Sequence, residues 1–181
     1  MKKKKAFAGA ILAAALLLYF STTAVAQSAV KLTDAEIASA AVTANQSDID
    51  FAKIAQQKSK NADVLQLAAT MAKDHQSVID QAVALVTKLN VTPKDNAFSK
   101  KLRTDAAATA KMLRGKSGAA FDKAYVDNEV AYHRAVIAAV ENVLILQADN
   151  GELKSLLQTV APVLQAHLEH AEMIQKKMSG K

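Results

Sequence analysis

Histidine and carboxylate side chains recur at positions where the surrounding sequence predicts the buried face of a helix. All four histidines of the chain occupy such positions, and so do two of its acidic residues. These six residues are His75, His133, His167, His170, Asp48 and Glu129. Imidazole nitrogen and carboxylate oxygen are ligands that suit Zn, Fe or Mn. The chain has no cysteine, so any transition-metal site must be built from these residue types.

The spacing of apolar residues places these groups inward. Positions separated alternately by four and three residues form one face of an amphipathic helix. One such stripe is Val64, Ala68, Met71, His75, Val78, Ala82, Leu85 and Leu89, and a second is Val126, Glu129, His133, Val136, Val140 and Val143. The other two are Leu153, Leu156, Val160, Val163, His167, His170 and Ile174, and Ala41, Ala44, Asp48, Phe51 and Ala55. We therefore expect four helices that each direct a polar group into a shared core.

Helix start and stop signals divide the chain into five helical segments. Thr33 followed by Glu36 forms a capping box, and Pro93 after Thr92 is typical of a helix start. The predicted segments are 33–58, 63–89, 93–114, 117–148 and 151–178. Short turns join the first to the second and the fourth to the fifth. The sequence thus predicts an all-α bundle of two antiparallel hairpins joined by a short crossover helix.

Residue counts from each turn predict which polar groups face each other. Asp48 lies about 12 residues before the first turn and His75 about 15 after it, a mismatch of only about 4 Å at 1.5 Å per residue. The same arithmetic pairs His133 with His167 across the second hairpin. It also pairs Glu129 with His170 one turn further out. The crossover helix leaves the register between the two hairpins open.

Burial of these groups has three readings. Unpaired buried polar groups are costly, and a bound cation removes that cost. The first reading is a metal site, and the second is a hydrogen-bonded network of Asp48 with His75 and Glu129 with His133. The third is a di-metal oxidase, which needs two metals about 3.5–4 Å apart and more inward carboxylates than the pattern supplies. Asp74 could be a partner of the site, but its position beside His75 favours a solvated carboxylate.

Length and composition exclude other classes of protein. The 181 residues suit one domain, and no phosphate-binding loop, nucleophile elbow or HExxH motif is present, so these motifs do not indicate an enzyme and the di-metal oxidase is the one enzymatic reading kept. Residues 2–5 are lysines, an apolar run follows over 6–20, and small residues end at Ala26, as in a secretory signal peptide. The net charge of +6 less those four lysines leaves +2 for the mature chain, which does not favour nucleic acid as a partner.

The expected domain organisation follows from that leader. Residues 1–26 are the signal peptide, 27–32 an N-terminal tail and 33–178 the helical bundle. We expect cleavage after Ala26, with no membrane span in the product, and location in a bacterial periplasm or outside the cell.

Three short runs give the chain a family resemblance. They are Met71–His75, Phe121–Tyr125 with His133 eight residues on, and Ala161–Leu168. Their order and spacing resemble the ferritin-like bacterial domain-of-unknown-function family 4142, over about residues 33–178. The resemblance implies a secreted or periplasmic protein with a metal site between helices, and some such proteins are labelled outer-membrane proteins. It lends no settled activity.

The resemblance also singles out particular residues. The recurring histidines of the family fall on His75, His133 and His167, and a recurring acidic position falls on Asp48, where Glu is usual. His170 and Glu129 lie outside the pattern. The di-iron signature of ferritin-like proteins places Glu and His three residues apart, whereas Glu129 and His133 are four apart, which argues against ferroxidase chemistry.

The favoured interpretation is a periplasmic metal-binding bundle that serves sequestration or stress protection. The alternative is a non-catalytic structural or interaction bundle whose buried polar network holds no metal. Either bundle could form a homo-oligomer.

Overall fold

The computed structural model describes residues 31–180. The predicted signal peptide and residues 27–30 of the predicted tail lie outside the described residues. The helices are α1 Asp34–Lys58, α2 Ala62–Lys88, α3 Ala97–Arg114, α4 Gly118–Ala139, α5 Ile145–Gln147 and α6 Gly151–Met178, with a π-helical segment η1 at Val140–Leu144 between α4 and α5. Within residues 31–180 there is no β-strand, so the all-α prediction is confirmed.

The long helices begin at side chains that satisfy free backbone amides. Thr33 forms the predicted capping box with Glu36 at the start of α1. Asn61 and Asn150 accept hydrogen bonds from the first amides of α2 and α6. These caps leave only short connections between α1 and α2 and between α5 and α6, and each connection turns the chain back on itself.

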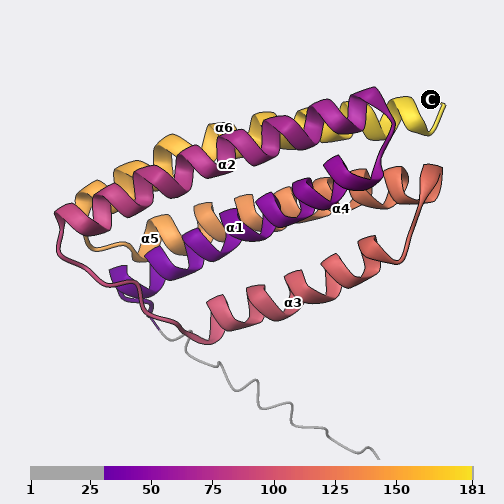
Figure 1. Ribbon diagram of the computed structural model, residues 1–181. Helices are drawn as coiled ribbons and strands as arrows, with labels where there is room; N and C mark the ends of the chain where they lie inside the picture. Colours follow the sequence, from indigo (N-terminus) through magenta and orange to yellow (C-terminus); the bar gives the residue numbers. More distant parts are fainter. Residues whose placement is uncertain (1–30, 181) are drawn as a thin grey trace, which may run out of the picture. The chain divides into compact units, whose positions relative to one another are not determined.

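The helices pair as two hairpins. α1 packs along α2, and α4 packs along α6 (Figure 1). The hairpins meet where α2 contacts α6 and α1 contacts α4, which gives a four-helix arrangement. The crossover helix α3 lies outside these four helices and packs mainly on α1 (Figure 1). No helix within residues 31–180 is long and apolar enough to span a membrane.

The start of α3 differs from the prediction, which placed it at Thr92 and Pro93. Its first residue is Ala97, because Asn96 and Ser99 form a reciprocal cap. The backbone amide of Lys94 instead donates to the carbonyl of Ala35, 2.9 Å away at the start of α1. The prediction of an earlier start is therefore wrong, since this tertiary contact holds the preceding segment in a non-helical path.

The predicted fourth helix, 117–148, is interrupted by η1. A π-helical turn accommodates one more residue than an α-helical turn. Val140 and Leu144 are consequently the buried residues of this stretch, whereas Val143, predicted to point inward, is only half-buried. Beyond Val140 the buried residues therefore no longer follow the spacing that the sequence predicted.

The stripe of α6 also differs from the predicted one in part. Leu153, Val160, His167 and Ile174 are buried as expected. Between them the buried residues are Leu157, Leu164, Leu168 and Ala171, rather than Leu156, Val163 and His170. The predicted and the observed stripes of α6 have every second residue in common. In the observed stripe Leu157 and Leu164 point inward, and His170 is left half-buried.

The core has two apolar clusters, with the polar residues between them. One cluster contains Phe51, Met71 and Tyr125, and the other contains Ile37 and Leu164. Along α1, Asp48 lies between Ile37 of one cluster and Phe51 of the other. The apolar clusters fix the four helices above and below the level at which the polar groups meet.

Candidate metal centre

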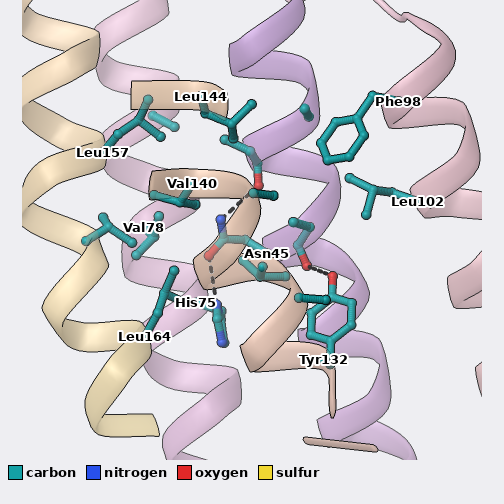
Figure 2. Close-up of a pocket in the computed structure, with 18 of the residues that line it drawn as sticks. Asn45, His75, Val78, Phe98, Leu102, Tyr132, Val140, Leu144, Leu157 and Leu164 are labelled. Atoms are coloured by element: carbon teal, nitrogen blue, oxygen red, sulfur yellow. Dashed lines mark hydrogen bonds between the residues drawn. The ribbon is translucent and has the colours of Figure 1, made fainter. Parts of the chain in front are cut away.

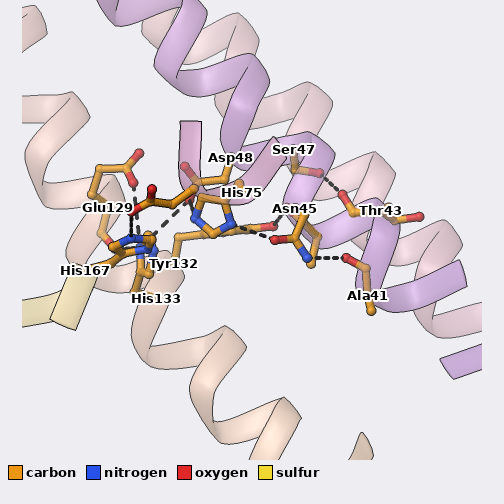
Figure 3. Close-up of polar contacts among 12 residues, drawn as sticks. Ala41, Thr43, Asn45, Ser47, Asp48, His75, Glu129, Tyr132, His133 and His167 are labelled. Carbon is orange, nitrogen blue, oxygen red and sulfur yellow. Dashed lines mark hydrogen bonds and ion pairs between the residues drawn. The ribbon is translucent and has the colours of Figure 1, made fainter. Parts of the chain in front are cut away.

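Each helix of the four-helix arrangement directs one or two polar side chains to the same level of the core. Asp48 comes from α1, His75 from α2, Glu129 and His133 from α4, and His167 from α6 (Figure 3). All five residues are buried. The open question of register is thereby answered, because the two hairpins bring their polar residues to one height.

Three imidazole rings form the centre of this group. The ring centroids of His75 and His167 are 5.2 Å apart, those of His133 and His167 are 5.4 Å apart, and those of His75 and His133 are 5.5 Å apart. One ring nitrogen from each histidine lies within 4.8 Å of the other two. A cation between the rings could therefore receive three nitrogen ligands from three helices.

One nitrogen of each ring is already engaged by an acceptor outside the trio. His75 Nδ1 lies 2.7 Å from Asn45 Oδ1, and Asn45 Nδ2 in turn donates to the carbonyl of Ala41 (Figure 3). His133 Nδ1 donates to the backbone carbonyl of Glu129 at 3.0 Å. His167 Nε2 lies 3.1 Å from Asp74 Oδ2. In a neutral imidazole these contacts place the proton on the engaged nitrogen.

The other nitrogen of each ring is buried and carries a lone pair. His75 Nε2, His133 Nε2 and His167 Nδ1 have no hydrogen-bond partner among residues 31–180. Metal-binding histidines in proteins have this arrangement, with one nitrogen on the ion and the other donating to a carboxylate or carbonyl. The hydrogen bonds thus leave one nitrogen of each ring without a partner among the described residues.

Two carboxyl groups lie beside the imidazoles. Asp48 Oδ2 is 3.6 Å from His75 Nε2 and 3.9 Å from His133 Nδ1, and Glu129 Oε2 is 3.7 Å from His133 Nδ1. Asp48, Glu129 and His133 form a second group whose ligand atoms lie within 4.8 Å of one another. Within the described part of the chain, none of the four carboxyl oxygens has a hydrogen-bond partner.

Burial decides the protonation of these groups. Burial lowers the pKa of His75 to about 2 and that of His133 to about 4, so both rings are neutral at pH 7. Burial raises the pKa of Asp48 to about 7. Burial, together with the neighbouring Asp48 carboxylate, raises the pKa of Glu129 well above its usual range. Burial therefore favours the neutral acid form of Glu129, while Asp48 is close to its midpoint at pH 7.

The two tyrosines near the site differ in their contacts. Tyr132 donates from its hydroxyl to the carbonyl of Ala44 at 2.8 Å, so it ties α4 to α1. Tyr125 is fully buried, and its hydroxyl lacks a hydrogen-bond partner within residues 31–180. Burial raises the pKa of Tyr125 well above its usual range, which keeps the phenol protonated.

The structure brings together five of the six candidate residues. The predicted contacts of Asp48 with His75 and of His133 with His167 are present. His170 belongs to neither group of ligand atoms, and its predicted pairing with Glu129 is absent from both groups. The cause is the frame of α6, which turns Ala171 inward instead of His170.

Two further side chains contact the histidines of the site, and the sequence pattern favoured neither of them as a partner. Asp74 is partly exposed, yet it contacts His167, so the less favoured reading of that residue is the one observed. Asn45 was not singled out, although it lies three residues before Asp48 and therefore on the same face of α1. A search for amide side chains one turn from each candidate ligand would have found it.

Together these features define a helical-bundle protein with a buried cluster of three histidines and two carboxyl groups. The chain belongs to the family described as Domain of unknown function (DUF4142), whose model matches residues 20–174. The resemblance noted in the sequence is thereby confirmed at the level of the family. No curated protein and no solved structure matches the chain.

Proposed function

We propose that this protein binds a transition-metal ion at the centre of the four helices, through His75, His133 and His167. The observation that supports the proposal most directly is the set of three buried ring nitrogens that lack partners within residues 31–180. Each belongs to a ring whose other nitrogen is held by an acceptor. One ring nitrogen from each histidine also lies within 4.8 Å of the other two.

The energetics of burial support the same proposal. A buried polar group without a partner costs about 1–3 kcal/mol. The three ring nitrogens are all such groups within the described residues. A bound cation would satisfy several of them at once. An ion would thus offset a penalty that the apolar clusters otherwise have to outweigh.

The donor set favours Zn or Fe over Mn. Imidazole nitrogens suit Zn and Fe, whereas Mn is typical of sites made mainly of carboxylate and water oxygens. Asp48 is the nearest candidate for an oxygen ligand, because its Oδ2 is 3.6 Å from His75 Nε2. Three histidines would supply three ligands, and the fourth position could be taken by Asp48 or by a ligand from outside the chain.

The proposed role is sequestration of metal or protection against metal stress in the periplasm or outside the cell. The leader-like residues 1–26 support that location. We also infer that the two hairpins and the crossover helix are a ferritin-like arrangement. A metal between helices is the use that such bundles make of inward His and carboxylate groups.

Metal analysis of the purified protein tests the proposal. Protein from its native compartment is compared with His75→Ala, His133→Ala and His167→Ala variants by elemental analysis. His170→Ala is the matched control, because His170 is a half-buried histidine of α6 outside both ligand groups. We expect one metal per chain in the wild type and the control, and none in the other three. A metal-free wild type under replete conditions would contradict the proposal and favour the hydrogen-bonded network.

A di-metal site is the second candidate. The observation in its favour is the second ligand group of Asp48, Glu129 and His133, which shares His133 with the first. Two metals per chain, together with consumption of oxygen or peroxide, would select this candidate. One metal per chain that survives Glu129→Gln would exclude it, since the second ion depends on that carboxylate.

A further inference from the structure

A cavity of about 300 Å³ adjoins the candidate metal centre. His75 and His133 line it together with Asn45, and most of the remaining lining is apolar (Figure 2). Figure 2 shows Val78, Leu157 and Leu164 on one side and Phe98 and Leu102 of α3 on the other. The cavity is therefore an apolar space with one polar end.

Small side chains and η1 form much of its wall. Ala41 and Ala44 of α1 and Ala82 of α2 line the cavity, where larger residues would fill the space. Val140 and Leu144, the first and last residues of η1, also line it. π-Helical turns inside α-helices occur frequently at functional sites. The irregular turn and the alanines together keep this volume open.

The cavity reaches the surface beside α3. Lys101 and Asp105 line it, are exposed, and pair with each other at 2.7 Å. α3 packs mainly on α1 and only slightly on α4. A molecule could therefore enter between α3 and the four-helix arrangement without separating the two hairpins.

The polar end has its hydrogen-bonding groups arranged toward the metal centre. Asn45 is engaged with His75 and with the carbonyl of Ala41. Tyr132 lines the cavity as well, and its hydroxyl is engaged with Ala44. The polar atoms left without partners among the described residues at this end are Nε2 of His75 and of His133. An occupant would meet apolar walls and, at the inner end, the imidazole rings of His75 and His133.

We infer that the cavity binds a small amphiphile, a hydrocarbon chain that ends in one oxygen group directed at the metal centre. An apolar cavity of about 150 Å³ holds a benzene molecule, so twice that volume suits about twelve non-hydrogen atoms. Medium-chain carboxylates and alcohols have this size and this distribution of polarity. The headgroup contact rests on the proposed metal function, whereas binding of the chain does not.

Titration calorimetry with two probes tests the inference. 1-Octanol is added to metal-free protein, because its neutral headgroup reports on the cavity alone. Octanoate is added to metal-free and zinc-loaded protein, because its carboxylate can reach a bound ion. We expect saturable binding of one octanol per chain, and at least tenfold tighter binding of octanoate once zinc is present.

Variants that fill the cavity provide the structural control. Ala82→Leu places a larger side chain on a buried residue of the lining, and Ala84→Leu makes the same change at an exposed position of the same helix. Octanol affinity should fall at least tenfold in Ala82→Leu and remain unchanged in Ala84→Leu. Ala41→Leu, on α1, repeats the test if Ala82→Leu does not fold. Thermal unfolding of both variants verifies that a cavity was filled rather than a core disrupted.

The outcomes separate the inference from the proposed function. Octanol binding that does not saturate, or that Ala82→Leu leaves unchanged, would overturn the inference. Zinc that binds but leaves octanoate affinity unchanged would overturn the headgroup contact. A protein that takes up no metal, yet binds octanol in a manner lost on filling the cavity, would contradict the metal function while supporting the cavity as a binding site.

Discussion

His75 Nδ1 lies 2.7 Å from the side-chain oxygen of Asn45, across the interface between α2 and α1. The amide of Asn45 is itself held by the carbonyl of Ala41, so its oxygen must face the ring. The proton of His75 therefore resides on Nδ1, and Nε2 remains available as a ligand. Asn45 positions His75 without belonging to the ligand group.

Loss of this contact should weaken metal binding. Replacing a residue that orients a metal-binding histidine typically lowers affinity about 10–100-fold. We expect Asn45→Ala to show a loss of that size in competition with a chromophoric chelator. Asn142→Ala is the matched control, because exposed Asn142 makes the same amide contact to the carbonyl four residues earlier. Equal affinities of the two variants would show that Asn45 does not position His75.

Glu129 should tolerate replacement by its neutral isostere. Because burial and Asp48 raise the pKa of Glu129 well above its usual range, the folded protein favours the uncharged form of this side chain. Glu129→Gln should then change the free energy of unfolding of the metal-free protein by no more than about 1 kcal/mol. Glu129→Ala should lose about 2 kcal/mol or more, because it leaves a void in the core. Urea unfolding measures both variants, and strong stabilisation by Gln would mean that Glu129 is ionised.

Metal binding should release about half a proton at pH 7 and close to one proton well below pH 7. The pKa of Asp48 is raised to about 7, so this carboxyl must lose its proton to bind an ion. His75 and His133 have pKa values of about 2 and about 4 and are already neutral. We expect affinity to fall about tenfold for each pH unit below 7, which corresponds to one proton. Asp48→Asn should remove this dependence, and a slope of two or more protons would contradict the assignment.

Acid should destabilise the metal-free protein through His75. Its pKa is 6.5 in the unfolded chain and about 2 in the folded chain, so below pH 6.5 the unfolded chain binds a proton that the folded chain does not. The free energy of unfolding then falls by up to about 1.4 kcal/mol for each pH unit below 6.5. Asp48 acts oppositely between its folded pKa of about 7 and its unfolded value of 3.8.

A comparison at matched pH isolates the contribution of His75. His75→Gln retains Asp48, so the opposite effect of that carboxyl cancels between the two proteins. Urea unfolding of both metal-free proteins at several pH values should show the wild type losing stability relative to the variant as pH falls. A difference that stays constant with pH would mean that His75 does not become harder to protonate on folding.

The sequence predicted the site best where a helix stays regular and its turn is near. Asp48 and His75 could be matched because residue counts from one short turn convert directly into height along two α-helices. The prediction failed for His170, since two stripes of α6 share every second residue and only packing against α4 and α2 selects between them. It failed beyond Val140, because nothing in the spacing of apolar residues marks a π-helical turn.

The common height of the two hairpins required the three-dimensional structure. α3 and the segment before it separate His75 from His133 in the sequence, and tertiary contacts such as Lys94 with Ala35 fix their path. Asp74 shows the same limit on a smaller scale. The position of Asp74 on α2 predicts a side chain directed toward solvent. Only the placement of α6 beside α2 brings His167 to the Asp74 carboxylate.

The three inward imidazoles come from α2, α4 and α6, and so from both hairpins. An ion held by them would join residues that are far apart in the unfolded chain, which has no such preformed site. Its binding free energy would therefore add to the stability of the whole fold. The folded fraction of the molecule, and with it its survival among proteases, would then rise and fall with the supply of metal, so that the abundance of the protein would itself record that supply.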